Sequence, residues 1–236
     1  GRTIDAIRNI GIAAGGMVEE DCRVTDVEKR GDTFHIIVTD HRGQYAEYET
    51  PLFINAMGAD GEHFARKLGI FTGTYPVRHQ AFITRRLPWL GANNTPLPLL
   101  IDRRRYKGFV AVYGQQLAET GQIIGCASPA CDPAESWKNQ QVNSEDFMHI
   151  FSEVFVNWLP ELSSVGIQAL WSGYYTEPRM VIDPDLGLFL GLRGQGFMLG
   201  QYLARLYADK LMGRPVPDYF RRLALSGDGM LEKAFK

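Results

Sequence analysis

A glycine-rich turn between an apolar run and a long helix pattern is the feature of this sequence best suited to chemistry. In GLFLGLRGQGFMLGQYLARLYADKLMG, residues 187–213, the apolar run leads into RGQG, and an amphipathic helix pattern follows. Gly194 and Gly196 leave backbone N–H groups uncovered where the helix begins, and the helix dipole favours negative charge there. Close packing of the helix on a sheet explains the same glycines, so the spacing alone leaves both interpretations open.

A second turn of small residues lies earlier in the chain. PLFINAMGADGEHFARKLG places an apolar strand, Leu52–Ile54, before the turn Asn55–Gly58, and a helix is expected to run from there through Leu68. Small residues in such a turn permit close approach of the backbone to a ligand or to another strand. Both interpretations stay open for this turn as well.

Composition is typical of a globular chain with a sizeable core. The 236 residues are 45% hydrophobic and 22% charged, with a net charge of -2. This balance gives no electrostatic reason to bind nucleic acid, and RHQAFITRR and DRRRYKG are interpreted as solvated hairpin faces. Cys22, Cys126 and Cys131 lack C-x-x-C spacing, the histidines lack metal-ligand spacing, and no apolar run is long enough to span a bilayer. The expected location is therefore cytoplasmic, without a bound metal.

Turn residues and apolar periodicity predict the elements that position the two turns. A helix over residues 3–16 should end at paired glycines, and a β-meander should follow, with turns at KRGD and DHRG. From Pro76 the pattern is β-type, and a helix then opens at Ser144. That helix carries an apolar stripe: Phe147, Ile150, Phe151, Val154 and Trp158. The stripe is expected to cover an antiparallel sheet.

The helix after the RGQG turn shows two stripes on its surface. One is made of small residues: Gly200, Ala204 and Ala208. The other is bulky: Leu199, Leu203, Leu206 and Leu211. A helix of this kind packs closely against a sheet.

Several segments, in the correct order, are similar to the C-terminal two thirds of the FAD-dependent amine and amino-acid oxidoreductases, which include glycine oxidase, sarcosine oxidase and D-amino acid dehydrogenases. The segments are RVTDVEK, INAMGADGEHFARKLG, PVRHQ, LWSGYYTEPRMVID and GLRGQGFMLGQYLARLYADKLMGRP. Family members place the dinucleotide turn G-x-G-x-x-G at their N-terminus, and this chain lacks it. Because the chain also starts without methionine, inside a helix pattern, we expect it to be part of a longer protein.

The resemblance implies an α+β fold of the glutathione-reductase-like, two-lobe type. Residues 1–75 would form part of an FAD-binding lobe, residues 76–169 a substrate lobe of antiparallel sheet with helices, and residues 170–236 the return to the FAD-binding lobe. The cofactor would be FAD, bound weakly or not at all by this chain alone. Its contacts by analogy would be Val24, Asn55, Ala56, Gly58, Gly194, Gln195, Gly196, Phe197 and Met198. The helix beginning at Gly196 would favour the negative charge that reduction places on the flavin.

Chemically, the resemblance implies oxidation of a C–N bond in an amine or amino acid by hydride transfer to flavin. Candidate catalytic residues are Tyr174, Tyr175 and Arg193, and Arg78 and Arg179 are candidates for substrate binding. An arginine suits a carboxylate because its planar fork donates two parallel hydrogen bonds. For each arginine a structural salt bridge is the alternative.

Two departures from the family pattern modify this expectation. Tyr175 occupies the position where many glycine-oxidase and D-amino-acid members carry the carboxylate-binding arginine, which favours an amine over an amino acid as substrate. Where sarcosine-oxidase-like members carry a cysteine bonded to FAD, this chain has Ser172 and Gly173, so FAD should be non-covalent. The alternatives to a partial enzyme are a non-catalytic subunit that kept the fold and lost FAD, and a split enzyme whose partner chain carries the dinucleotide turn. An electron acceptor or partner subunit is also expected.

Overall fold

The computed structural model describes residues 2–90, 97–106, 108–129 and 145–226. The chain consists of two compact units, each with its own internal contacts. The first unit comprises Gly1–Ile54 and His63–Phe71, and the second comprises Asn55–Glu62 and Thr72–Lys236. Both units combine helices with antiparallel strands, so the predicted mixed helix and sheet class is confirmed.

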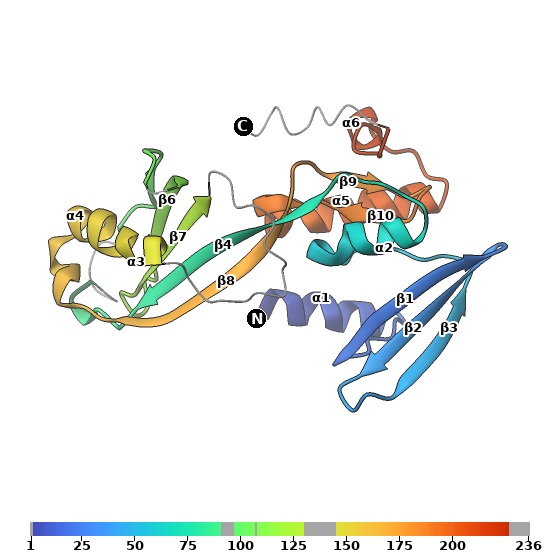
Figure 1. Cartoon of the computed structure of the whole chain (residues 1–236), viewed down its shortest axis with the longest axis horizontal. Helices are drawn as coiled ribbons and strands as arrows, with labels where there is room; N and C mark the ends of the chain where they lie inside the picture. Colours follow the sequence, from blue (N-terminus) through green and yellow to red (C-terminus); the bar gives the residue numbers. More distant parts are fainter. Residues whose placement is uncertain (1, 91–96, 107, 130–144, 227–236) are drawn as a thin grey trace. The chain divides into compact units, whose positions relative to one another are not determined.

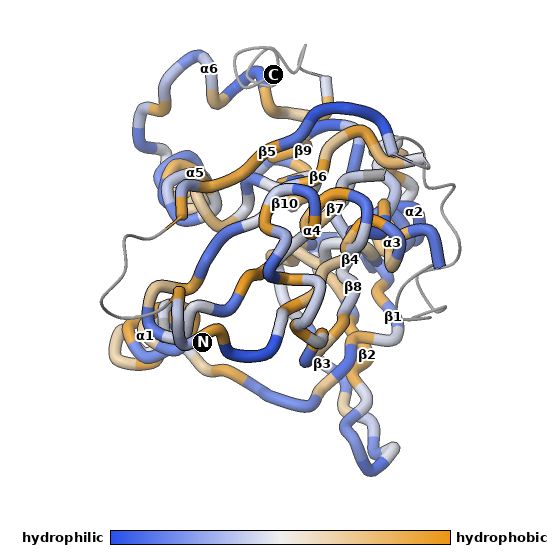
Figure 2. Tube along the Cα trace, turned by 90° about the vertical axis from the view of Figure 1, so that its left-hand side faces the viewer, coloured by the Kyte–Doolittle hydropathy of each residue, from blue (hydrophilic) through white to orange (hydrophobic). Residues whose placement is uncertain are grey.

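The first unit opens with the predicted helix, α1 (Arg2–Ala13). It ends at Gly15, whose φ of 91° lies in the left-handed region, and the Gly16 N–H donates to the Gly11 carbonyl at 3.0 Å. This is the glycine-terminated helix end that the paired glycines predict. The helix trace alternates between hydrophobic and hydrophilic stretches in Figure 2.

A three-stranded meander follows α1 in the first unit. It consists of β1 (Cys22–Arg30), β2 (Thr33–Asp40) and β3 (Tyr45–Thr50), all antiparallel and paired in chain order. Gly31 and Gly43 occupy the two hairpin turns with φ of 60° and 77°. Glycine adopts these angles without the steric cost of a side chain, and both predicted turns are therefore confirmed.

The second unit is organised around one antiparallel sheet. Its strands are β4 (Tyr75–Thr84), β5 (Leu100–Asp102), β6 (Phe109–Gln116), β7 (Ile123–Pro129) and β8 (Ile167–Glu177). They lie in the order β5-β6-β7-β4-β8. The two long strands, β4 and β8, pair along their whole length and extend beyond the other three (Figure 1). β4 carries Arg78, and β8 carries Tyr174 and Tyr175.

Helices cover one face of this sheet, as the apolar stripe predicts. The segments are α3 (Glu145–Ile150), a π-helical turn (Phe151–Phe155) and α4 (Val156–Trp158). Phe147, Ile150 and Val154 are each 1% exposed, whereas Phe151 and Trp158 are only partly buried. Phe155, outside the predicted stripe, is buried instead, because the π turn adds a residue per turn and rotates it inward. The predicted N-cap, Ser144, lies outside the described residues.

A smaller layer completes the second unit. It contains the hairpin of β9 (Val181–Asp183) and β10 (Leu188–Leu190), the long α5 (Gly196–Leu211) and the short α6 (Asp218–Arg221). Leu203 and Leu206 are buried against this layer, and Leu199 is partly buried. Leu211, predicted to share the stripe, is 41% exposed because it is the last residue of the helix.

The predicted strand Leu52–Ile54 is wrong. Only Asn55 pairs, through an isolated parallel bridge to Leu188 of β10. A strand needs a neighbouring strand that offers backbone hydrogen-bond partners along its length. Here only Asn55 finds such a partner. The following helix, α2 (Gly61–Lys67), is confirmed, preceded by a 3-10 turn, η1 (Gly58–Asp60).

Candidate functional site

The register of β4 and β8 separates the candidate residues onto two faces of the sheet. Directly opposite residues share a face, and successive residues alternate. Val77 pairs with Tyr175, whereas Arg78 pairs with Tyr174 on the other face. The Arg78 face is also the face of Phe82, which packs against the helices. The structure therefore does not bring Tyr174 and Arg78 together with Tyr175.

The Tyr175 side chain lies at the centre of a compact cluster on the opposite face. Its ring lies 3.9 Å from the ring of His79, centroid to centroid, with 30° between the planes. A side-chain hydrogen bond joins Tyr175 to Tyr113 of β6, which also bonds Cys126 of β7. A Cβ atom added at Gly194 would lie 2.9 Å from the Tyr175 ring, so the glycine turn rests directly on this tyrosine.

Burial keeps the protic groups of this cluster uncharged. It raises the pKa of the Tyr113 hydroxyl well above its usual range, and the hydrogen bonds to Cys126 and Tyr175 add to the effect. Burial likewise raises the pKa of the Cys126 thiol. At neutral pH the tyrosine and the cysteine are thus a phenol and a thiol.

His79 is neutral for a related reason. Burial lowers its pKa to about 4, and the positive charge of Arg193 contributes in the same direction. Its Nδ1 atom is buried and has no hydrogen-bond partner among the described residues. The histidine therefore presents an uncharged ring beneath Tyr175.

Two of the candidate arginines hold partners within the protein. The Nε atom of Arg193 lies 2.6 Å from Oε2 of Glu177, the last residue of β8, and both side chains are mostly buried. Arg193 has a φ of 55°, which places it in the left-handed region at the start of the turn. Arg179 donates from Nη2 to the carbonyl of Leu225 at 2.8 Å. The salt-bridge alternative thus describes Arg193, and Arg179 is tied to the C-terminal segment.

The turn from Gly194 to Met198 combines the N–H groups of a helix start with exposed apolar side chains. A short 3-10 turn, η5 (Arg193–Gln195), enters α5, and no side chain caps the helix. Phe197 is 74% exposed and Met198 is 71% exposed. Uncapped N–H groups beside apolar side chains suit a group that is polar at one edge and apolar on its face.

The Asn55 turn is held together by its own hydrogen bonds. Asn55 is fully buried, and its Nδ2 atom donates to the Gly61 carbonyl at 2.8 Å. Its Oδ1 atom accepts from the Met57 N–H at 3.3 Å, and its backbone pairs with Gly187 and Phe189. The side chain of Asn55 is therefore engaged in the turn, and the Met57 and Gly58 carbonyls accept hydrogen bonds from the N–H groups of Asp60 and Gly61.

Replacing Asn55 with alanine is expected to lower the free energy of unfolding by about 1–3 kcal/mol, because buried backbone groups lose their partners. The control is Asn157→Ala, which removes an exposed amide bonded to the Glu153 carbonyl and should change stability by less than about 0.5 kcal/mol. Urea unfolding of both variants checks the difference. Equal losses would contradict the structural role of Asn55.

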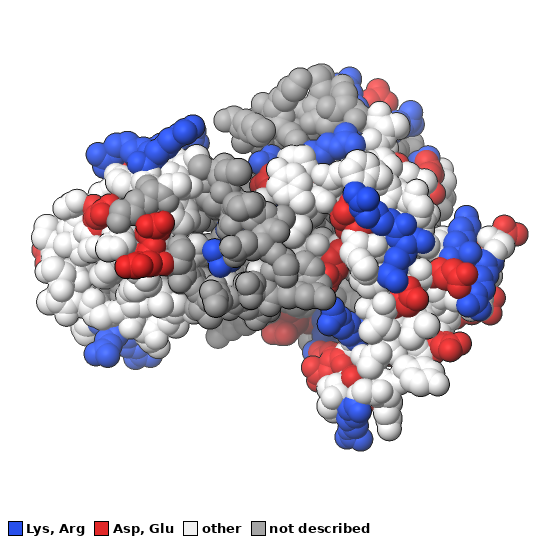
Figure 3. Space-filling view, viewed as in Figure 1, with Lys and Arg blue, Asp and Glu red and all other residues white. Residues whose placement is uncertain are grey.

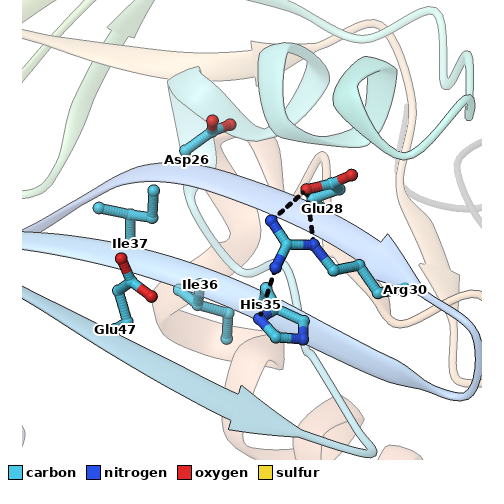
Figure 4. A pocket seen from close by; sticks show the side chains of 7 residues that line it. All are labelled: Asp26, Glu28, Arg30, His35, Ile36, Ile37 and Glu47. Atoms are coloured by element: carbon cyan, nitrogen blue, oxygen red, sulfur yellow. Dashed lines mark hydrogen bonds and ion pairs between the residues drawn. The ribbon is translucent and has the colours of Figure 1, made fainter.

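Val24 belongs to the first unit, in β1, and later residues of that strand, Asp26, Glu28 and Arg30, line a cavity on the meander. The cavity has a volume of about 120 Å³. Figure 4 shows its lining side chains, where Arg30 contacts Glu28 at 2.9 Å and the His35 ring at 3.3 Å. Ligand pockets usually occupy about 300 Å³ or more, so this cavity is too small for a nucleotide.

In the segment DRRRYKG, Asp102 ends β5, and the described residues 103–106 follow it. Arg104 pairs with Asp102 at 2.6 Å while remaining 75% exposed. Arg104 holds the pKa of the Asp102 carboxyl well below its usual range, chiefly through its side-chain hydrogen bond. Figure 3 shows Lys and Arg side chains together over the end of this hairpin. The loop agrees with a solvated hairpin face.

A family model described as FAD dependent oxidoreductase, DAO, matches residues 2–210. The chain belongs to this family of FAD-dependent oxidoreductases. The resemblance drawn from the sequence is thereby confirmed. No functionally curated protein matches the chain.

Solved structures of flavoproteins share the fold of this family member. NikD, an unusual amino acid oxidase essential for nikkomycin biosynthesis, aligns with a TM-score of 0.72 at 17% identity, over 94% of this chain and 58% of its own. Glycine oxidase from Geobacillus kaustophilus aligns with a TM-score of 0.66 at 17% identity, over 91% and 54%. Iminodiacetate oxidase from Chelativorans sp. BNC1 aligns with a TM-score of 0.65 at 16% identity, over 89% and 54%. The chain thus spans little more than half the length of these proteins.

Four members of the cluster around Tyr175 escaped prediction from the sequence: His79, Tyr113, Cys126 and Glu177. His79 stands within PVRHQ, a segment that the resemblance already marked, beside the arginine that was chosen instead. Tyr113 and Cys126 lie on β6 and β7, and only the sheet brings them near β8. Within the described ranges of this family member, no helix is long and apolar enough to cross a membrane, and no group of side chains suits a metal ion.

Proposed function

We propose that this chain is the portion of an FAD-dependent oxidoreductase that holds the substrate and receives the flavin ring, in an enzyme that oxidises the C–N bond of an amine or amino acid. One observation supports the proposal above the others. Tyr175, on the face of the sheet opposite the helices, contacts the Gly194 turn on one side and His79 on the other. A substrate on that face would therefore lie beside a ring held at the turn.

The residues at the turn fit the proposed cofactor. The uncapped N–H groups at the start of α5 and the exposed Phe197 and Met198 would hold the polar edge and the face of the flavin ring. Bound there non-covalently, FAD supplies the acceptor for a hydride from the substrate carbon. The positive end of the α5 dipole would favour the negative charge that the ring gains.

The chain's own residues would position the substrate and exclude water. The uncharged His79 and Tyr113 surround Tyr175 without adding charge to the face. The Arg193–Glu177 ion pair would fix the start of the Gly194 turn to the end of β8. Because the chemistry belongs to the cofactor, this positioning is the protein's contribution to the rate.

The proposed function is tested on the protein expressed from its whole open reading frame. Its visible absorption spectrum is recorded, and secondary amines and D- and L-amino acids are then added without oxygen. Flavin bands that bleach with a substrate would support the oxidoreductase. A colourless protein that takes up no added FAD would overturn it in favour of the non-catalytic subunit.

Replacing Gly196 with leucine in that protein is expected to weaken FAD binding or slow flavin reduction by about tenfold or more, because the side chain crowds the ring edge. The backbone tolerates the change, since Gly196 has a helical φ of −56° and an added Cβ would meet only the flexible Leu192 side chain, at 3.2 Å. Gly200→Ala, one helical turn further along, is the control, because the added Cβ would lie 3.7 Å from the Leu192 Cδ1 atom, an ordinary contact distance. FAD titration and stopped-flow reduction measure both, and wild-type values for Gly196→Leu would contradict the role of the turn.

A further inference from the structure

We propose that the substrate is an apolar or aromatic amine that carries no carboxylate beside its amino group. It would be held on the Tyr175 face, the face of β4 and β8 that lies opposite the helices. This inference rests on the proposed function and narrows its substrate class.

Among the described strand residues on the Tyr175 face, no cation is placed to receive a carboxylate. By register, its described residues on β4 and β8 are Tyr75, Val77, His79, Ala81, Ile83, Ala169, Trp171, Gly173, Tyr175 and Glu177. The same face continues across β7 and β6 through Cys126 and Tyr113, which pair with each other. None of these strand residues is lysine or arginine. Burying a carboxylate without a charged partner is costly, so this face disfavours one.

The arginines near the face do not change that balance. Arg193 lies at its edge, where the Glu177 carboxylate, 2.6 Å away, offsets its charge. Arg179 is bonded to the Leu225 carbonyl. Arg78 projects from the opposite face of β4, since it pairs with Tyr174. A substrate carboxylate would have to displace Glu177 from Arg193 in order to gain a partner.

Aromatic rings and open space favour an amine with an apolar body. Trp171 is 42% exposed on this face, and Tyr175 and Tyr113 line it further along. The faces of such rings attract an ammonium or a polarised N–H group. A Cβ added at Gly173, directly opposite His79, would meet no atom of the described residues within 4 Å, which leaves room beside the histidine ring.

The test compares N-methylbenzylamine with N-methylphenylglycine, which is the same amine with a carboxylate on its benzylic carbon. Each is added anaerobically to the FAD-loaded, full-length protein, and binding of each is measured separately by calorimetry. We expect the amine to bind and to bleach the flavin about tenfold or more better, since the carboxylate gains no charged partner. Equal or better binding and bleaching by N-methylphenylglycine would overturn the inference and leave the proposed function standing. If the amine binds preferentially and neither compound bleaches the flavin, the proposed function fails while the binding preference stands.

A pair of Tyr175 variants makes the inference sharper. Tyr175→Arg places a guanidinium on the face and is expected to reverse the preference toward N-methylphenylglycine by about tenfold or more. Tyr175→Phe is the matched control, which keeps the ring, removes the hydroxyl and should keep the preference for the amine. If the arginine variant folds, binds FAD and still prefers the amine as the parent does, a carboxylate partner at this position does not decide the substrate class, and the inference is wrong.

Discussion

Replacing Gly191 with alanine is expected to lower the free energy of unfolding of the second unit by more than about 4 kcal/mol, among the largest effects of a single methyl group. Gly191 has a φ of 73°, and an added Cβ would overlap the carbonyl oxygen of Arg179 and lie 2.8 Å from its carbonyl carbon. The obstacle is backbone at the β9–β10 hairpin, which cannot rotate away as a side chain would. Because Gly191 also leads into the Gly194 turn, flavin binding should be lost together with stability.

Gly213→Ala is the matched control for this prediction. Its φ of 70° is nearly the same, but an added Cβ would meet no atom within 4 Å. The strain of a left-handed alanine alone costs about 1–2 kcal/mol. Urea unfolding of the two variants separates strain from overlap, and similar losses for both would show that the overlap at Gly191 is relieved.

Acidification from pH 6.5 toward pH 4 is expected to remove up to roughly 3 kcal/mol of stability through His79 alone. The unfolded chain protonates this histidine near its ordinary pKa of 6.5, whereas burial and Arg193 lower the pKa in the folded protein to about 4. Between these values the unfolded state binds more protons, so stability rises with pH. The stability that depends on a neutral His79 is therefore fully present above pH 6.5. It is lost as the pH falls from 6.5 toward 4.

His79→Gln tests the assignment, because it removes the titrating group and keeps a polar side chain of similar reach. Unfolding by urea at pH 7 and pH 4.5 should show a smaller difference between the two pH values for this variant than for the parent. His149→Gln, at an exposed histidine of the same unit, is the control and should behave as the parent does. An unchanged pH difference in His79→Gln would assign the acid sensitivity to other groups.

Much of the fold follows from local sequence. Paired glycines end α1, glycines with positive φ make the hairpins of the meander, and RGQG precedes the start of α5. Each of these features depends on backbone preferences of a few neighbouring residues, which is why residue type predicts them. The failure at Leu52–Ile54 has the complementary cause, since a strand exists only where another strand meets it.

The candidate site divides in the same way. By itself the sequence determined the glycine turn, the order of the family's segments and the tyrosine at position 175. Only the tertiary structure decided that Tyr175 stacks on His79 and that Arg193 pairs with Glu177. The register of β4 and β8 also decided which candidates share a face, and it separated Arg78 from Tyr175. These contacts join residues far apart in the chain, and their geometry depends on how distant strands align, which no local preference encodes.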